Sequence, residues 1–232
     1  SAYAKTQFGK AKFEKNVLVD LEGKEVVIGG MDSKDVLQVK DVLEDLKELF
    51  KSGHPDIHAV GVDDLDRIWK LKKGEITLIT GYGNHGKSQF LRWTLLQRAL
   101  VLGEKSCFFA PEDAPVHEFY FALTEMLLGC NLLPTNTNRP DESLFDIAHK
   151  FIGEHFIFVY PSDISPTPTY IKSKFLQVIL EHRVSSVIID PFNQLANDYG
   201  STGGRSDKYL ETFLSDFAKF SKDNKVHGII VA

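Results

Sequence analysis

Short apolar runs alternate along the chain with longer segments in which apolar residues recur every three or four positions. The runs lie at residues 75–80, 106–110, 156–160, 187–190 and 229–232. Continuous apolar runs of this length are typical of strands buried on both faces, and periodic segments are typical of helices that cover such a sheet. The alternation therefore predicts an α/β fold with a mostly parallel central sheet.

The first sixty residues follow a different pattern. Residues 1–15 are basic with two interleaved phenylalanines, and predict either a nucleic-acid-binding arm or a solvated terminus that docks its aromatic rings. Two β-branched runs at 17–19 and 26–28 flank Glu22-Gly23 and predict a small hairpin. A helical period over 36–50 leaves an apolar stripe that must pack on its own domain or on a neighbouring subunit. We place the arm, hairpin and helix in residues 1–60 and the main domain in residues 61–232.

One segment of the main domain has the pattern of a phosphate-binding loop. It runs from Gly81 to Ser88 and lies between a predicted strand and a predicted helix, which disfavours a ligand-free glycine-rich turn. Glycines let backbone N–H groups turn toward phosphates, and the amino end of the helix attracts the same anion. Lys87 is expected to reach the β- and γ-phosphates, and Ser88 to bind the accompanying Mg²⁺. The residues predicted to bind ATP, or another nucleoside triphosphate, are Gly81, Gly83, Asn84, His85, Gly86, Lys87, Ser88 and Gln89.

Two further strands end in carboxylates. Glu112 follows the run at 106–110 and is predicted to orient and deprotonate the water that attacks a γ-phosphate. The alternative is that Glu112 or Asp113 only caps the helix that starts near Val116. Asp190 ends the run Val-Ile-Ile and is predicted to complete the Mg²⁺ site with the phosphate-loop serine.

Residues 197–207 are rich in Asn, Gly, Ser and Asp, which disfavour regular structure. Arg205 and Lys208 in or beside this segment are candidates for contact with a nucleic-acid backbone or a neighbouring subunit. A plain surface connection is the open alternative.

Composition adds few constraints. Apolar residues make up 43% and charged residues 25%, as in an ordinary globular protein, and no apolar run is long enough for a membrane span. The net charge of −5 provides no global attraction for nucleic acid, so any such binding needs a local basic surface. The two cysteines lack metal-ligand spacing and are expected to be core thiols. We expect a cytoplasmic protein.

Taken together, these segments resemble the ATPase domain of ring-forming replicative helicases: the DnaB family, and especially the phage primase-helicases and Twinkle. RecA-type recombinases share the same RecA-like P-loop core. The resemblance spans residues from about 60 to 232. It is carried by Lys72–Glu75, the phosphate loop, the strand ends at Glu112 and Asp190, the loop before Lys208 and the helix at Phe213–Ala218.

The resemblance implies a function. It makes Lys87 and Glu112 catalytic residues, and Ser88 and Asp190 metal ligands, of an ATP- and Mg²⁺-dependent DNA helicase. Its implied partners are single-stranded DNA, further copies of the chain in a hexameric ring, and a primase. The segment 197–207 would face the DNA channel, and the helix at 36–50 would be a linker that docks on the next subunit. Such an enzyme would work in a bacterial or phage-infected cell, or in an organelle matrix.

One departure from the family pattern lowers the expected activity. The family has further strands after the one at 229–232, which carry a γ-phosphate sensor and an arginine that reaches the neighbour's ATP. We therefore expect the isolated chain to hydrolyse ATP weakly. The rival classes are a RecA-like recombinase or other DNA-dependent ATPase, a small-molecule kinase, and a nucleotide-gated assembly module that does not unwind DNA.

Overall fold

The computed structural model describes residues 4–6, 9–14, 17–19, 37–54, 57–161, 166–196 and 206–232. Contacts within it divide the chain into two compact units, Ser1–His54 and Pro55–Ala232. The sequence placed this boundary after Val60. Val60 is buried, and its backbone N–H binds the Asp66 carboxylate of the second unit.

The first unit contains a three-stranded antiparallel sheet and a helix. β1 (Ala4–Thr6) pairs with β2 (Gly9–Glu14), which pairs with β3 (Val17–Val19). Strands before residue 15 were not predicted, although the alternation Lys-Ala-Lys-Phe-Glu in β2 is a strand signal. The predicted partner run at 26–28 lies outside the described residues.

The predicted helix at 36–50 is shorter at its amino end than expected. A 3₁₀ turn, η1 (Val39–Asp41), precedes α1 (Leu43–Ser52), because the backbone at Val42 leaves the helical region. None of the residues of α1 is buried.

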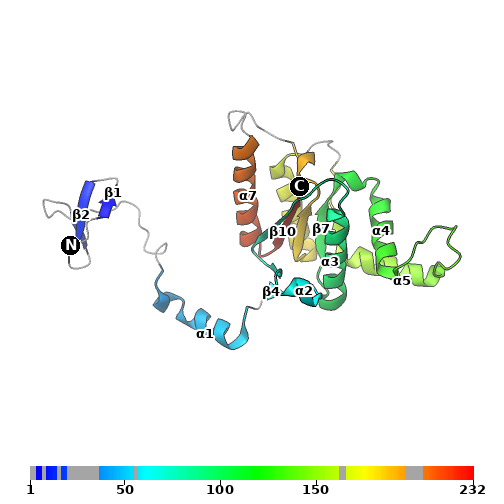
Figure 1. The fold of residues 1–232 in the computed structure, drawn as a ribbon, viewed down its shortest axis with the longest axis horizontal. Coiled ribbons are helices and arrows are strands. Elements are labelled where there is room, and N and C mark those ends of the chain that lie inside the picture. Colours follow the sequence, from blue (N-terminus) through cyan, green and yellow to red (C-terminus); the bar gives the residue numbers. More distant parts are fainter. Residues whose placement is uncertain are drawn as a thin grey trace. The chain divides into compact units, whose positions relative to one another are not determined.

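The second unit is built on a five-stranded sheet (Figure 1). Its strands are β6 (Ile76–Ile79), β7 (Ser106–Phe109), β8 (Phe156–Phe158), β9 (Ser186–Ile189) and β10 (His227–Val231). They lie in the order β6-β10-β9-β7-β8, and all four pairs are parallel. A smaller antiparallel pair, β4 (Ile57–His58) and β5 (Leu71–Lys72), flanks the short helix α2 (Asp63–Asp66).

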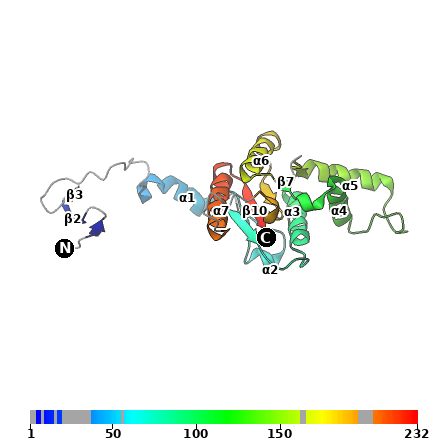
Figure 2. The same cartoon turned by 90° about the horizontal axis from the view of Figure 1, so that it is seen from above.

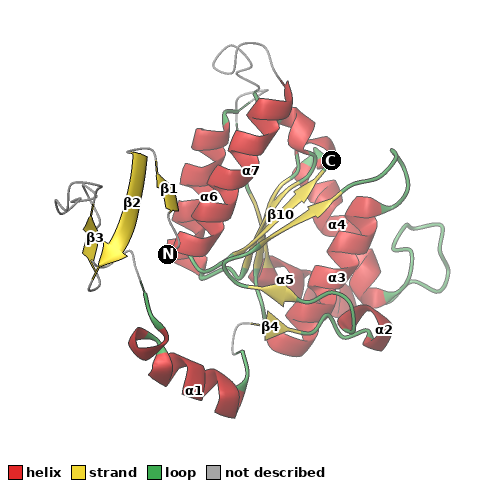
Figure 3. Cartoon of the chain, turned by 60° about the vertical axis from the view of Figure 1, so that its left-hand side comes forward, coloured by secondary structure: helices red, strands yellow, loops and turns green. Residues whose placement is uncertain are grey.

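Helices cover both faces of this sheet (Figures 2 and 3). One face packs on α3 (Lys87–Leu102), α4 (Val116–Leu128) and α5 (Glu142–His155). The other face packs on α6 (Pro168–His182) and α7 (Ser206–Asp223). Neighbouring strand residues alternate between the two cores, as Phe108 and Phe109 do in β7. The predicted α/β fold with a parallel sheet is confirmed.

The three predicted chemical segments all follow the carboxyl ends of strands. The phosphate loop follows β6, a 3₁₀ turn η2 (Pro111–Asp113) follows β7, and Asp190 with a second turn η3 (Phe192–Gln194) follows β9. Parallel strands bring these ends to one edge of the sheet, where open α/β sheets place their ligand crevices. A search of the described helices finds none that is both long and apolar enough to span a lipid bilayer.

Candidate nucleotide site

The phosphate loop joins β6 to the amino end of α3. Gly86 caps α3 in the left-handed conformation, with φ 79°, and Asn84 also has a positive φ, of 61°. A side chain at Gly86 would meet no neighbour, so glycine is needed there for its backbone freedom and not for space. The Lys87 ammonium donates to the carbonyl oxygens of Gly81, at 2.7 Å, and Tyr82, at 3.0 Å. The lysine thus holds the loop closed around its own backbone.

Ser88 and Asp190 meet beneath this loop. The Ser88 hydroxyl donates to the Asp190 carboxylate, which is 6% exposed. Burial raises the pKa of Asp190, and the nearby carboxylates of Asp113 and Glu112 act in the same direction. The Ser88 hydrogen bond and the positive charge of Arg92 oppose this rise. The residues form the pair of oxygen ligands that the sequence predicted.

Glu112 lies in η2, directly after β7. Its carboxylate accepts a hydrogen bond of 3.0 Å from the Gln194 carboxamide, which belongs to η3 after the neighbouring strand β9. The alternative role as a helix cap does not occur, because Pro115 is the residue before α4 and no side chain caps that helix. Glu112 is therefore free of the structural duty that competed with catalysis.

Asp113 has a different partner. It forms an ion pair with Arg92, whose side chain is 11% exposed and whose guanidinium carbon lies 5.4 Å from the centre of the Phe119 ring. Arg92 follows Ser88 by one helical turn, so both side chains emerge from the same face of α3. The pairing fixes η2 against the phosphate-loop helix.

These groups surround one cavity of about 590 Å³ at the carboxyl edge of the sheet. Its lining includes every residue predicted for the phosphate loop, together with Glu112 and Asp190. Sequence reasoning missed five further lining residues, although the spacing of one turn from Ser88 could have indicated the first of them: Arg92, Pro191, Asn193, Val231 and Ala232.

The residues predicted to contact nucleic acid are not part of this cavity. Lys208 lies near the start of α7 with an exposed side chain, and Arg205 lies outside the described residues. Their role stays a prediction.

The Ser88 and Asp190 oxygens suit Mg²⁺. Among the described residues, no group of three or more His, Cys, Asp or Glu side chains could hold a metal ion. Mg²⁺ usually keeps several waters and takes one or two protein oxygens together with substrate phosphates. A hydroxyl and a buried carboxylate beside a phosphate-binding loop match that donor set, whereas a softer metal would require nitrogen or sulfur ligands.

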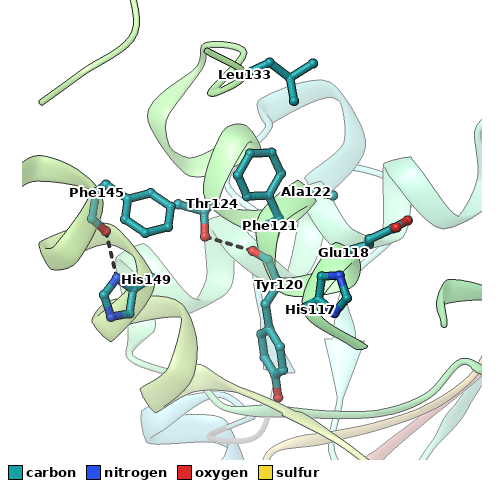
Figure 4. A pocket seen from close by; sticks show the side chains of 9 residues that line it. All are labelled: His117, Glu118, Tyr120, Phe121, Ala122, Thr124, Leu133, Phe145 and His149. Atoms are coloured by element: carbon teal, nitrogen blue, oxygen red, sulfur yellow. Dashed lines mark hydrogen bonds between the residues drawn. The ribbon is translucent and has the colours of Figure 1, made fainter. Parts of the chain in front are cut away.

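A second cavity, of about 680 Å³, lies between α4 and α5 (Figure 4). Its lining is mainly apolar, with the rings of Tyr120, Phe121 and Phe145 and the side chain of Leu133. The hydrogen bonds drawn there, from Thr124 to the Tyr120 carbonyl and between His149 and the Phe145 carbonyl, are local to each helix. It lacks the convergent polar groups of a reaction site.

The fold and the first cavity together define an α/β domain of the phosphate-loop type, and comparison with known proteins narrows the class. No protein-family model matches the chain. The chain is 22% identical over 204 residues to the Twinkle homolog protein, chloroplastic/mitochondrial, of Arabidopsis thaliana. The match covers 83% of this chain but only 28% of that relative.

Solved structures show the same fold. A solved ATPase domain superposes with a TM-score of 0.63 at 16% identity, over 85% of this chain and 71% of that chain. A DnaB-like replicative helicase, studied with its primase interactions, gives a TM-score of 0.64 at 16% identity, over 84% of this chain and 49% of that one. The resemblance to DnaB- and Twinkle-type ATPase domains that the sequence predicted is confirmed.

Proposed function

We propose that the carboxyl-edge cavity binds ATP, or another nucleoside triphosphate, with Mg²⁺ and that the domain hydrolyses it. The observation that carries the proposal is the convergence of three separate strand ends on one cavity. The phosphate loop, the buried Ser88–Asp190 pair and Glu112 all line it. Each is weak alone, but their meeting in one cavity has no structural requirement behind it.

Each residue then has a distinct task. The loop amides and the amino end of α3 would hold the phosphates, and Lys87 would exchange its bonds to loop carbonyls for bonds to phosphate oxygens. Ser88 and Asp190 would hold Mg²⁺, which when bound neutralises charge that develops on the phosphates. Glu112 would orient the attacking water and accept its proton.

We further infer that hydrolysis serves movement along single-stranded DNA, in a replicative helicase with a ring of identical subunits. Similarity to the Twinkle homolog and to the DnaB-like helicase supports this function. Lys208 and Arg205, next to the 197–207 segment, would contact the DNA backbone, and a primase would be a partner. The place of work would be the cytoplasm or an organelle matrix, where DNA is replicated.

We propose that α1 contributes to the ring by packing into the α4–α5 cavity of a second copy. Leu43, Leu46 and Phe50 are exposed on one stripe of α1, and Phe50 is 92% exposed. The α4–α5 cavity offers an apolar surface of complementary character, lined by Phe121 and Phe145. Phe50→Asp should lower the mass of the assembly measured by light scattering, whereas Leu180→Asp, at an exposed position on α6, should not. Assembly that survives Phe50→Asp would contradict this role for α1.

Two substitutions test the enzyme. Lys87→Ala should abolish binding of a fluorescent ATP analogue, because the main phosphate contact is lost. Glu112→Gln should keep binding within about twofold but lower hydrolysis by roughly a hundredfold or more. Normal hydrolysis in Glu112→Gln would place the base elsewhere.

A forked DNA substrate separates the rival classes. A helicase unwinds the fork with ATP and loses unwinding in Glu112→Gln. A recombinase would hydrolyse ATP on single-stranded DNA but exchange strands in place of unwinding. An assembly module would associate on nucleotide binding and be indifferent to Glu112→Gln.

A further inference from the structure

Two turns face each other across neighbouring parallel strands. η2 follows β7 and η3 follows β9, and the two strands pair up to Phe109 and Ile189. One more ladder bond, from the Asp190 N–H to the Phe109 carbonyl at 2.9 Å, keeps the strand ends level. Both turns therefore begin at the same height above the sheet.

Each turn is fixed by residues other than the two that meet. On the η2 side, Asp113 is paired with Arg92. On the η3 side, the Phe192 ring lies 4.7 Å from the Phe213 ring, and Leu195 is 1% exposed in the core. The backbone positions of both turns thus follow from packing.

Between the fixed turns, Gln194 donates from Nε2 to Oε1 of Glu112 at 3.0 Å. Glu112 is exposed and would otherwise sample several side-chain conformations. One amide bond restricts that freedom and occupies one carboxylate oxygen. The second oxygen keeps its capacity to accept a proton.

We propose that Gln194 is a positioning residue that holds the Glu112 carboxylate for its work in the cavity. The inference rests on the proposed function, because it gives Glu112 the part of the base. Gln194 does not line the cavity and would not touch the nucleotide. Its effect would pass through Glu112 alone and would therefore be absent from nucleotide binding.

The first experiment compares three variants of the full chain in steady-state ATP hydrolysis. Gln194→Met keeps the length of the side chain without its donor, and should lower kcat about tenfold with KM within about twofold. Gln194→Glu places a like charge against Glu112 and should lower kcat further. The control is Gln177→Met, because Gln177 donates to Glu181 at 3.1 Å on the outside of α6, remote from the cavity. It should leave both constants unchanged.

The second experiment asks whether Gln194 acts through Glu112. In a Glu112→Asp background the shorter side chain withdraws the carboxylate, so adding Gln194→Met should cost nothing more. An equal loss in both backgrounds, a rise in KM in place of a fall in kcat, or a change below twofold would overturn the inference and leave the proposed function standing. A wild-type chain that binds ATP but never hydrolyses it would instead overturn the proposed hydrolysis, and the inference with it.

Discussion

The two edges of the central sheet contain similar buried polar side chains in opposite circumstances. At the amino edge, His227 at the start of β10 uses both ring nitrogens, one with the Lys72 carbonyl at 2.7 Å and one with the Thr77 hydroxyl at 2.8 Å. Arg98 and Glu104 pair there at 2.5 Å with side chains that are 3% and 10% exposed. At the carboxyl edge, the groups face a cavity.

The difference separates structural from functional polar groups. Polar groups at the amino edge bind one another, so their removal should cost stability and leave nucleotide binding intact. Polar groups at the carboxyl edge are arranged toward a ligand. Burial raises the pKa of Asp190 against the charge it would need with Mg²⁺, which is a cost to the folded state that function explains. Substitutions at the two edges should therefore have opposite signatures.

The largest effect is expected from Arg98→Met at the amino edge. The variant leaves the Glu104 carboxylate buried without its charge partner, and the free energy of unfolding should fall by about 3–5 kcal/mol in chemical denaturation. Adding Glu104→Leu should recover much of the loss, because no buried charge remains. The control Lys172→Met removes a more exposed pair with Asp216 and should cost less than about 1 kcal/mol. A loss in Arg98→Met no greater than in that control would remove the contrast between the edges.

A smaller loss is expected from Gly228→Ala in β10. An added Cβ would lie 2.5 Å from the Ser221 hydroxyl and 2.7 Å from the Phe217 ring, so α7 must move away from the sheet. The free energy of unfolding should fall by about 1–3 kcal/mol. Gly153→Ala is the matched control: it lies in α5 with nothing within 4 Å, and should stabilise by up to about 1 kcal/mol. Equal effects of the two substitutions would show that α7 does not approach the sheet as described.

The sequence predicted the carboxyl edge better than the amino edge. Glycine spacing around Lys87 and single carboxylates after apolar runs are local patterns, and topology alone brings them together. Gln194 was missed because its partner Glu112 lies 82 positions away, and no local pattern marks a pair that only the sheet order brings together. The same holds for His227, whose partners include Lys72, 155 positions earlier.

Local pattern also failed where it was weak. The strands β1 and β2 were missed because basic residues dominate their composition, and α1 began later than its apolar period. Periodicity reports which residues share a face, whereas the first residue of a helix depends on the backbone conformation before it.

His227 should make stability depend on pH. Burial lowers its pKa below the usual value of 6.5, with Arg98 acting in the same direction. The unfolded chain therefore binds a proton more readily, and stability should fall as pH drops below about 6.5, by at most roughly 1.4 kcal/mol per pH unit. Denaturation between pH 7.5 and 5 should show a smaller slope in His227→Gln. His149→Gln, at an exposed position on α5, should keep the wild-type slope. An unchanged slope in His227→Gln would assign the effect to other groups.

The smallest effect on stability, with the opposite sign, is expected from Asp190→Asn at the carboxyl edge. Because burial disfavours the carboxylate, removing its charge should raise the free energy of unfolding by up to about 1 kcal/mol, and Ser88 keeps an oxygen to bind. Mg²⁺-dependent binding of ATP should weaken sharply in the same variant, measured by titration with and without EDTA.

The same substitution at Asp141 provides the control for that sign. Asp141 caps α5 by accepting from the Leu144 N–H, and this bond lowers the pKa of its carboxyl, so the charged form suits the folded state. Asp141→Asn should therefore lower stability slightly, because the helix end loses a favourable charge, and should leave nucleotide binding unchanged. Loss of stability in Asp190→Asn as well would mean that its carboxylate serves the fold, and the distinction between the two edges would fail at its most informative residue.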